Sequence, residues 1–259
     1  MKKIIAVALL FITFLYPINN VFAEDAMGNE EERKKVVYLT FDDGPSKNTP
    51  AVLEVLKKHN IKATFFVVGE QFQYFQNELK LLLESGNPVH VHCYRHSNWI
   101  YGSQDNYCSD YKKCKETLKS HGWQETKFVR FPGGSSNKYR KTSAFRDIRQ
   151  YIVGHGLYYV DWNVSAEDAI HNMLSPNEIL CNVKKYNKDP NTSVLLMHDG
   201  GMNKTAAAGL EKVIEYFKSE GYEFKCINDD MSEEEIKLLT DKGVLNKFNK
   251  EKTTANDLP

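Results

Sequence analysis

Seven short apolar runs alternate with longer amphipathic segments along this chain of 259 residues, and this alternation restricts the fold more than any other feature. The runs are VVYLTFDD (36–43), ATFFVVG (63–69), PVHVH (88–92), KFVRFPGG (127–134), YYVDWN (158–163), SVLLMHD (193–199) and the weaker EFKCI (223–227). Between them the spacing predicts helices near 49–60, 71–85, 105–121, 137–153, 175–188 and 204–219. Nearly continuous apolar strands separated by helices are typical of a parallel sheet with both faces covered. With this many strand–helix units we expect an α/β barrel, and an open sheet stays as the alternative.

Two of the predicted helices carry start signals. Pro50 follows Thr49 and falls in a first helical turn, where the missing N–H of proline has no cost. The stretch from Ser175 to Glu178 has the pattern of a capping box with Pro176 at the first helical position. We therefore expect helices to begin close to residues 49 and 175.

The N-terminus has the pattern of an export signal. A basic start is followed by the apolar run IIAVALLFITFL and by VFA, which ends at Ala23 and resembles a signal-peptidase site. A retained membrane anchor is the alternative, but the run is shorter than the ~20 residues that a span needs. We expect a signal peptide over 1–23, a charged linker over 24–35, a globular domain over 36–229, and a C-terminal helix and tail over 230–259. The expected location is secreted or cell-wall associated, with no stable membrane span after signal removal.

Composition argues against two classes of protein. The chain has 34 basic and 34 acidic residues, and removal of Lys2 and Lys3 with the signal leaves 34 − 2 = 32 bases, a net charge of −2. That balance is not the basic surface of a nucleic-acid binder. An odd number of cysteines cannot all pair within one chain, their spacing matches no zinc finger, and buried thiols are expected. The cysteines are Cys93, Cys108, Cys114, Cys181 and Cys226.

Polar and ionisable residues gather at the ends of five predicted strands, where α/β barrels assemble their sites. They are Asp42 and Asp43, His92 with His96 four residues later, Arg130 followed by Pro132-Gly133-Gly134, Asp161, and His198 with Asp199. Singly, each has an ordinary structural explanation: a carboxylate that caps a helix, a core histidine, or a structural ion pair. Together they would crowd one rim, which is costly for buried charges without partners. The pattern therefore indicates a functional site.

These motifs carry a resemblance to a known family. The ordered set TFDDGP, HxxxH, RFPGG, DWN and LLMH resembles the five motifs of the polysaccharide deacetylase family, also called the NodB-homology or carbohydrate esterase family 4 proteins. The resemblance covers about residues 36–228. It implies a distorted (β/α)7 barrel and metal-dependent removal of acetyl groups from N-acetylated sugars.

The resemblance also implies roles for individual residues. Asp43, His92 and His96 would hold the metal, and Asp42 and His198 would be the catalytic base and acid. Arg130 would orient Asp42, Asp161 would orient His198, and a backbone N–H near Gly133 would help to hold the oxyanion. Two imidazoles and one carboxylate suit Zn²⁺ with an open position. The same set accepts Co, Ni or Mn, so the sequence does not fix the metal.

The departures from the family pattern lie in the stretch GNPVHVHCYRH. Cys93 stands where Ser or Thr usually follows the first histidine ligand, and we expect a buried thiol there rather than an extra soft ligand. His90 lies on the same strand face as His92. It is either an alternative ligand or a residue packed beneath the site.

The expected substrate is an N-acetylated polysaccharide, with N-acetylglucosamine residues of peptidoglycan favoured. Chitin oligomers and acetylxylan are the alternatives among substrates, and a carbohydrate-binding pseudoenzyme is the alternative outside catalysis. Trp99, Tyr101 and Trp162 are candidates for stacking on sugar rings, although Trp162 equally fits the core. We expect a monomer.

Overall fold

The computed structural model describes residues 34–169, 174–200 and 205–248. The expected signal peptide over 1–23 lies outside the described residues. All the described elements belong to one compact unit that begins at Lys34.

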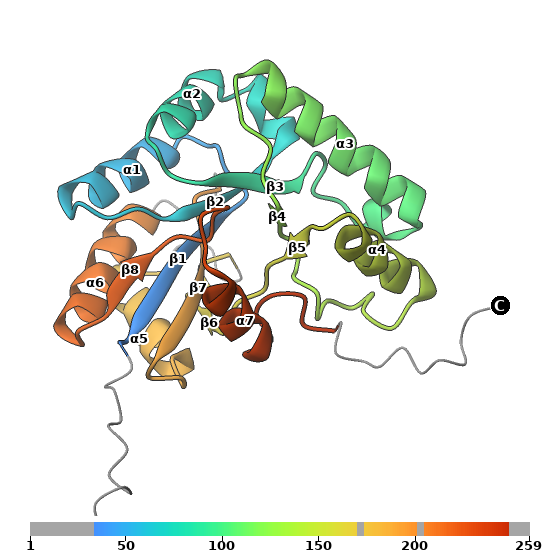
Figure 1. Ribbon diagram of the computed structural model, residues 1–259. Helices are drawn as coiled ribbons and strands as arrows, with labels where there is room; N and C mark the ends of the chain where they lie inside the picture. The colour runs from blue at the N-terminus through green and yellow to red at the C-terminus, as the bar shows by residue number, and fades with distance from the viewer. Residues whose placement is uncertain (1–33, 170–173, 201–204, 249–259) are drawn as a thin grey trace, which may run out of the picture. The chain divides into compact units, whose positions relative to one another are not determined.

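The core of this unit is a parallel sheet (Figure 1). Its strands are β1 (Val36–Asp42), β2 (Thr64–Val68), β3 (Val89–Cys93), β4 (Phe128–Val129), β5 (Tyr158–Tyr159), β6 (Val164–Ser165), β7 (Thr192–His198) and β8 (Glu223–Lys225). The order across the sheet is β5-β4-β3-β2-β1-β7-β6, and β8 pairs with β1. The two outermost strands, β5 and β6, are separated by residues 160–163 alone. Because a residue spans at most ~3.6 Å, the two ends of the sheet lie close together and the sheet must curl into a barrel-like form.

Strand β1 is the centre of the sheet. It pairs with β7 along its whole length, from Val36 opposite Thr192 to Asp42 opposite His198. Its other edge pairs with β8 at the beginning of the strand and with β2 at its end. The carboxyl end of β1 is therefore held by strands on both sides.

Helices surround the strands (Figure 1). They are α1 (Thr49–Lys58), α2 (Gln76–Glu84), α3 (Gln104–Ser120), α4 (Ser143–Gly154), α5 (Pro176–Tyr186), α6 (Ala206–Ser219) and α7 (Glu233–Asp241), with short 3-10 turns η1 (Gly69–Gln73) and η2 (Asn98–Tyr101). The capping box predicted at Ser175 is confirmed. Within the described segments, no helix combines the length and the apolar character needed to cross a bilayer.

Alternation along the strands separates two apolar clusters. The outer cluster packs beneath the helices and includes Val37, Leu39, Phe41, Phe65, Val67, Val91, Cys93 and Met197. The floor cluster lies on the opposite strand face and consists of Tyr38, Phe66, Phe128, Val160, Val194, Ile227, Leu239, Val244 and Leu245. Residues of the floor face that come later in their strands are polar: Thr40 and Asp42 follow Tyr38 on β1, and His92 follows His90 on β3. The strands thus change from apolar to ionisable along one face.

The C-terminal segment completes the floor cluster. Leu239 of α7 is fully buried, and Val244 and Leu245 follow it into the same cluster. Leu245 forms an antiparallel bridge with Val160, and the Asn246 side chain accepts a hydrogen bond from the Tyr159 N–H at 3.0 Å. Residues after the predicted domain end therefore contribute to the interior of the barrel.

Candidate active site

Asp43 lies at the centre of a cluster of metal-ligand atoms. It follows the last residue of β1 in a left-handed conformation, with φ of +72°. Its Oδ1 is 3.5 Å from Nε2 of His92 and 3.5 Å from Nε2 of His96, and this oxygen is buried without a hydrogen bond. A buried carboxylate oxygen without a donor is costly unless a cation completes it. The three side chains each offer one ligand atom, all within 4.8 Å of one another.

The hydrogen bonding of His92 leaves its inner nitrogen available. Nδ1 is 2.8 Å from the carbonyl oxygen of Arg130, and because that oxygen can only accept, Nδ1 carries the proton. Nε2 then presents its lone pair to Asp43. Burial lowers the pKa of His92, which keeps the ring neutral, as a ligand must be. Two imidazoles and a carboxylate fit a divalent metal with open coordination positions.

His90 and Cys93 stand apart from this cluster. Both ring nitrogens of His90 are engaged, Nδ1 at 2.8 Å from Thr126 Oγ1 and Nε2 at 2.8 Å from the carbonyl oxygen of Ile227. Its ring lies against Phe66 and Phe128 of the floor cluster. Cys93 points the other way, into the outer cluster, and burial raises the pKa of its thiol well above the usual range. His90 is therefore a core histidine, and Cys93 is a buried protonated thiol.

The expected pair between Arg130 and Asp42 is present. Arg130 Nη1 donates to Asp42 Oδ1 at 2.9 Å and to Thr40 Oγ1 at 2.7 Å, and the guanidinium is fully buried. Its Nε donates to the carbonyl oxygen of Val160 at 3.1 Å. A guanidinium with this many fixed acceptors is rigid. It holds the Asp42 carboxylate in place, with Asp42 Oδ2 4.0 Å from His92 Nε2.

His198 pairs with Asp168, and the expected pairing with Asp161 is wrong. His198 Nδ1 lies 2.8 Å from Asp168 Oδ1, and the His198 backbone N–H donates to Asp168 Oδ2 at 2.9 Å. Burial alone would lower the pKa of His198, but the hydrogen bond and charge of Asp168 outweigh it and raise this pKa to about 9. Asp161 instead accepts hydrogen bonds from the backbone N–H of Ser135, at 2.7 Å, and from the Ser135 hydroxyl.

The register of β6 explains why Asp168, and not Asp161, pairs with His198. This two-residue strand was not predicted, and it pairs Val164 with Leu195 and Ser165 with Leu196 of β7. The chain then turns at Glu167, which has a φ of +55°, and brings Asp168 beside the end of β7. Asp161 lies before this strand, at the end of β5, and turns toward the loop after β4. The signal available in the sequence was the second aspartate in DWNVSAED.

The loop after β4 forms another wall of the site. Gly133 and Gly134 both have positive φ, which other residues adopt only with strain. A Cβ at Gly134 would lie 2.9 Å from Asp161 Oδ1 and 2.9 Å from the Trp162 ring, so the loop is packed closely against both. Trp162 is half-buried there and also lies 5.6 Å from the Arg130 guanidinium.

The other aromatic candidates differ in exposure. Trp99 is 51% exposed and is available for stacking. Tyr101 is buried, and its hydroxyl donates to the carbonyl oxygen of Pro132 at 2.8 Å. The expectation that Tyr101 stacks on a sugar is therefore wrong, because its ring packs against Tyr139 and Phe145.

Asp199 supports the loop that carries Asp43. It is fully buried, accepts a hydrogen bond from Thr49 Oγ1 at 2.5 Å, and lies so close to Gly44 that a Cβ there would be 2.4 Å from its Oδ2. Burial, opposed by the Thr49 hydrogen bond, raises the pKa of Asp199 to about 7. The sequence marked Asp199 only as the residue after His198, so this supporting position was missed.

This chain is similar to known polysaccharide deacetylases. A family model described as polysaccharide deacetylase matches residues 29–148. A peptidoglycan-N-acetylglucosamine deacetylase of Bacillus cereus is 34% identical over 195 residues, which are 74% of this chain and 66% of that protein. The corresponding enzyme PgdA of Listeria monocytogenes is 34% identical over 197 residues, which are 75% of this chain and 38% of that protein. The chain thus spans about two thirds of the first relative and well under half of the second.

A solved structure shares the fold. The catalytic domain of a peptidoglycan N-acetylglucosamine deacetylase from Eubacterium rectale is 33% identical, with a TM-score of 0.69. The match covers 76% of this chain and 90% of that domain. This likeness confirms the α/β barrel predicted from the alternation of strands and helices, and its distorted form, which the family resemblance implied.

Proposed function

Because this chain belongs to the polysaccharide deacetylase family, we propose that it hydrolyses N-acetyl groups of a cell-wall polysaccharide, with N-acetylglucosamine residues of peptidoglycan as the substrate. One observation carries the proposal. Asp42 and His198 are register partners at the ends of two neighbouring strands, and the metal-ligand cluster lies beside Asp42. Amide hydrolysis requires a base and an acid close to a Lewis-acid position.

A divalent metal held by Asp43, His92 and His96 would polarise the acetyl carbonyl and lower the pKa of water. Zn²⁺ suits this donor set, and Co, Ni or Mn can replace it. Because the protein supplies three ligand atoms, an ion held there would keep coordination positions for water and substrate.

The residues of the chain divide the proton transfers between them. Asp42 accepts the proton of the attacking water, and Arg130 fixes its carboxylate for that step. His198 donates a proton to the sugar nitrogen, because an amide nitrogen does not leave as an anion. Asp168 keeps His198 protonated near neutral pH and fixes its ring, so that Nε2 is the donating atom. A backbone N–H near Gly133 would stabilise the developing oxyanion.

The substrate choice rests on two lines of support. Relatives that are 34% identical to this chain over 195 and 197 aligned residues are named peptidoglycan-N-acetylglucosamine deacetylases. The first 23 residues have the pattern of a signal peptide, so we propose export, which would bring the domain to the cell wall. The intact Asp42–Asp43 pair supports catalysis and argues against a carbohydrate-binding pseudoenzyme.

The experiment is acetate release by the purified protein from peptidoglycan, chitin oligomers and acetylxylan, before and after removal of metal by a chelator. We expect the highest rate on peptidoglycan, loss of activity without metal, and recovery on addition of Zn²⁺. Asp42→Asn is the matched control, because it keeps all three metal ligands and should lose ~100-fold or more in turnover. Full activity of metal-free protein would contradict the mechanism, and a higher rate on acetylxylan would replace the substrate.

A further inference from the structure

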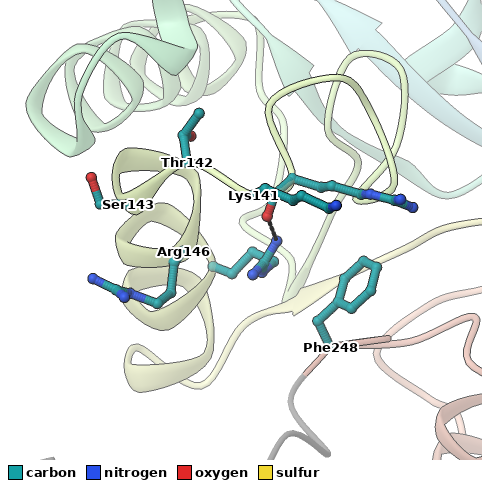
Figure 2. Close-up of a pocket in the computed structure, with 7 residues that line it drawn as sticks. Lys141, Thr142, Ser143, Arg146 and Phe248 are labelled. Carbon is teal, nitrogen blue, oxygen red and sulfur yellow. Dashed lines mark hydrogen bonds between the residues drawn. The ribbon is translucent and has the colours of Figure 1, made fainter.

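A pocket lies at the start of α4, and none of its lining residues belongs to the metal-ligand cluster (Figure 2). Its volume is about 560 Å³. The stretch KYRKTSAFRDIR (138–149), which forms most of it, has five basic residues and one acidic residue, 5 − 1 = +4, in a chain whose formal net charge is zero. The lining residues are Arg140, Lys141, Thr142, Ser143, Arg146, Arg149 and Phe248. Such a local excess of positive charge favours an anionic ligand.

Arg149 is the central residue of this pocket. It is 8% exposed, and its Nη1 donates to the carbonyl oxygen of Arg140 at 3.2 Å (dashed line in Figure 2). No carboxylate of the described residues forms an ion pair with it. Its guanidinium otherwise lies over the rings of Phe145, at 5.2 Å, and Phe248, at 4.9 Å. A buried cation with five donors and a single carbonyl acceptor is incompletely compensated.

The other cations of the pocket differ from Arg149 in exposure and in their counter-charges. Arg140 and Lys141 are exposed and come immediately before Thr142, the N-cap of α4. Arg146 extends from the helix away from Phe248 in Figure 2, and its Nε lies 3.4 Å from Asp147 Oδ1. Arg146 therefore already has a counter-charge, whereas Arg149 lacks one among the described residues.

We propose that this pocket binds a phosphate group carried by an anionic polymer or by a small solute. A guanidinium fork matches the paired oxygens of a phosphate, and Lys141 and the Ser143 hydroxyl supply further donors for a tetrahedral anion. A carboxylate, with two oxygens, uses fewer of these donors. Because α4 follows β4, the pocket lies at the carboxyl edge of the sheet, the same edge as the metal-ligand cluster. The inference does not depend on the proposed deacetylase activity.

The first test is titration of the metal-loaded protein with inorganic phosphate by calorimetry, at constant ionic strength maintained with chloride. We expect saturable binding that Arg140→Gln/Lys141→Gln weakens by about tenfold or more, as the loss of charge-assisted hydrogen bonds predicts. Lys80→Gln/Lys237→Gln is the matched control, because it removes two positive charges from exposed side chains on other helices. Arg149→Lys keeps the charge but loses the fork, and it should also weaken binding.

A second variant separates this pocket from the metal site, which can itself bind phosphate. Asp43→Asn removes a metal ligand and should leave the phosphate binding that depends on Arg140 and Lys141 unchanged. If deacetylation fails but this binding remains, only the proposed function is contradicted. If phosphate binding is absent, or is lost in Asp43→Asn and retained in Arg140→Gln/Lys141→Gln, the pocket proposal is wrong.

A polymer test distinguishes the source of the phosphate and excludes general charge attraction. We expect the protein to be retained on immobilised polyglycerol phosphate, a phosphodiester polymer, and released by free inorganic phosphate. Retention should be several-fold weaker on polyglutamate of similar charge. Binding of inorganic phosphate without polymer retention would assign the pocket to a small solute. Equal retention on both polymers, in the parent and in Arg140→Gln/Lys141→Gln, would overturn the proposal.

Discussion

His90 and His92 lie two residues apart on the same face of β3, yet they belong to regions with opposite physical character. His90 lies in the floor of the barrel, where aromatic rings surround it and both nitrogens are hydrogen-bonded within the protein. His92 lies at the rim, where one nitrogen is bonded to a carbonyl and the other faces the unsatisfied Oδ1 of Asp43. Burial lowers the pKa of both rings.

The difference shows that burial alone does not identify a functional histidine. Both rings are at least 98% buried, since His90 is 0% and His92 2% exposed. What separates them is the number of satisfied nitrogens. A fully satisfied buried histidine stabilises the fold, whereas one with a free lone pair beside a carboxylate is ready to bind a metal. Four predictions test this contrast between the floor and the rim.

The largest expected effect comes from replacing each of the two histidines singly by glutamine. His92→Gln should lower metal affinity and deacetylase activity by at least ~100-fold, because it removes a ligand from a set of three. His90→Gln should keep one metal per chain and most of the activity, while the free energy of unfolding falls by ~1–3 kcal/mol from the lost ring contacts and hydrogen bonds. Metal content by mass spectrometry and denaturant unfolding measure the two effects. A His90→Gln protein that folds but no longer binds metal would remove the distinction.

The next effect concerns the two aspartates near the rim. Asp168→Asn should lower turnover by ~10–100-fold, because His198 loses the partner that orients and protonates it. Asp168 raises the pKa of His198 to about 9, so the alkaline limb of the pH–rate profile should move to lower pH in this variant. Asp161→Asn should leave that limb in place, since Asp161 bonds Ser135 and not His198. If the alkaline limb moves in Asp161→Asn and not in Asp168→Asn, Asp161 is the partner of His198 after all.

The sequence predicted the parts of the molecule that depend on alternation within one segment. All seven apolar runs form strands. The set of metal-ligand residues was implied by the family resemblance and not by this alternation. The position of Asp168 could not be predicted in this way, because it depends on the register of β6 against β7 and on the turn at Glu167. The same is true of Arg149. It reads as one more base on an amphipathic helix, and its burial beside Phe248 depends on a segment 99 positions later in the chain.

The start of α4 is a second feature that the sequence pattern did not predict correctly. The spacing predicted a helix from residue 137, but α4 begins at Ser143. The residues in between form turns, in which Asn137 accepts a hydrogen bond from Arg140 and Tyr139 accepts one from Thr142. The Thr142 side chain then caps the helix by accepting from the Phe145 N–H at 3.2 Å. The N-cap residue Thr142 determines where α4 begins, whereas hydrophobic periodicity predicted only that a helix is present.

The third prediction uses pH to separate floor from rim. Burial lowers the pKa of His90 in the folded protein to about 4. Between about pH 6.5 and 4 the unfolded chain therefore carries a proton on this ring, whereas the folded chain does not. The free energy of unfolding should therefore fall between about pH 6.5 and 4, by up to ~3 kcal/mol from this residue. His198 has the opposite sign: its folded pKa of about 9 stabilises the fold below about pH 6.5, and this contribution is lost as the pH rises through 9.

Matched variants isolate these two contributions. Urea unfolding across pH should give a flatter acidic side in His90→Gln than in the parent, and a flatter alkaline side in His198→Gln. The acidic side of His198→Gln and the alkaline side of His90→Gln should follow the parent. If the acidic loss of stability is unchanged in His90→Gln, other groups cause it and His90 is not held neutral by the floor.

The smallest expected effect concerns Cys93, which is adjacent to His92 but points into the outer cluster. If strand alternation determines which face each side chain occupies, the Cys93 thiol lies on the face opposite the ligand atoms. Cys93→Thr should then leave metal affinity and stoichiometry unchanged and should alter activity by less than ~3-fold. The added hydroxyl enters an apolar cluster, so the free energy of unfolding should fall by ~1 kcal/mol unless it finds an acceptor. Cys93→Ala removes the thiol without adding a polar group and separates the two terms. Zinc titration of all three proteins with a competing chelator gives the answer. A sharp loss of affinity in both variants would make the thiolate a ligand, and alternation along β3 would then not be what separates ligands from core.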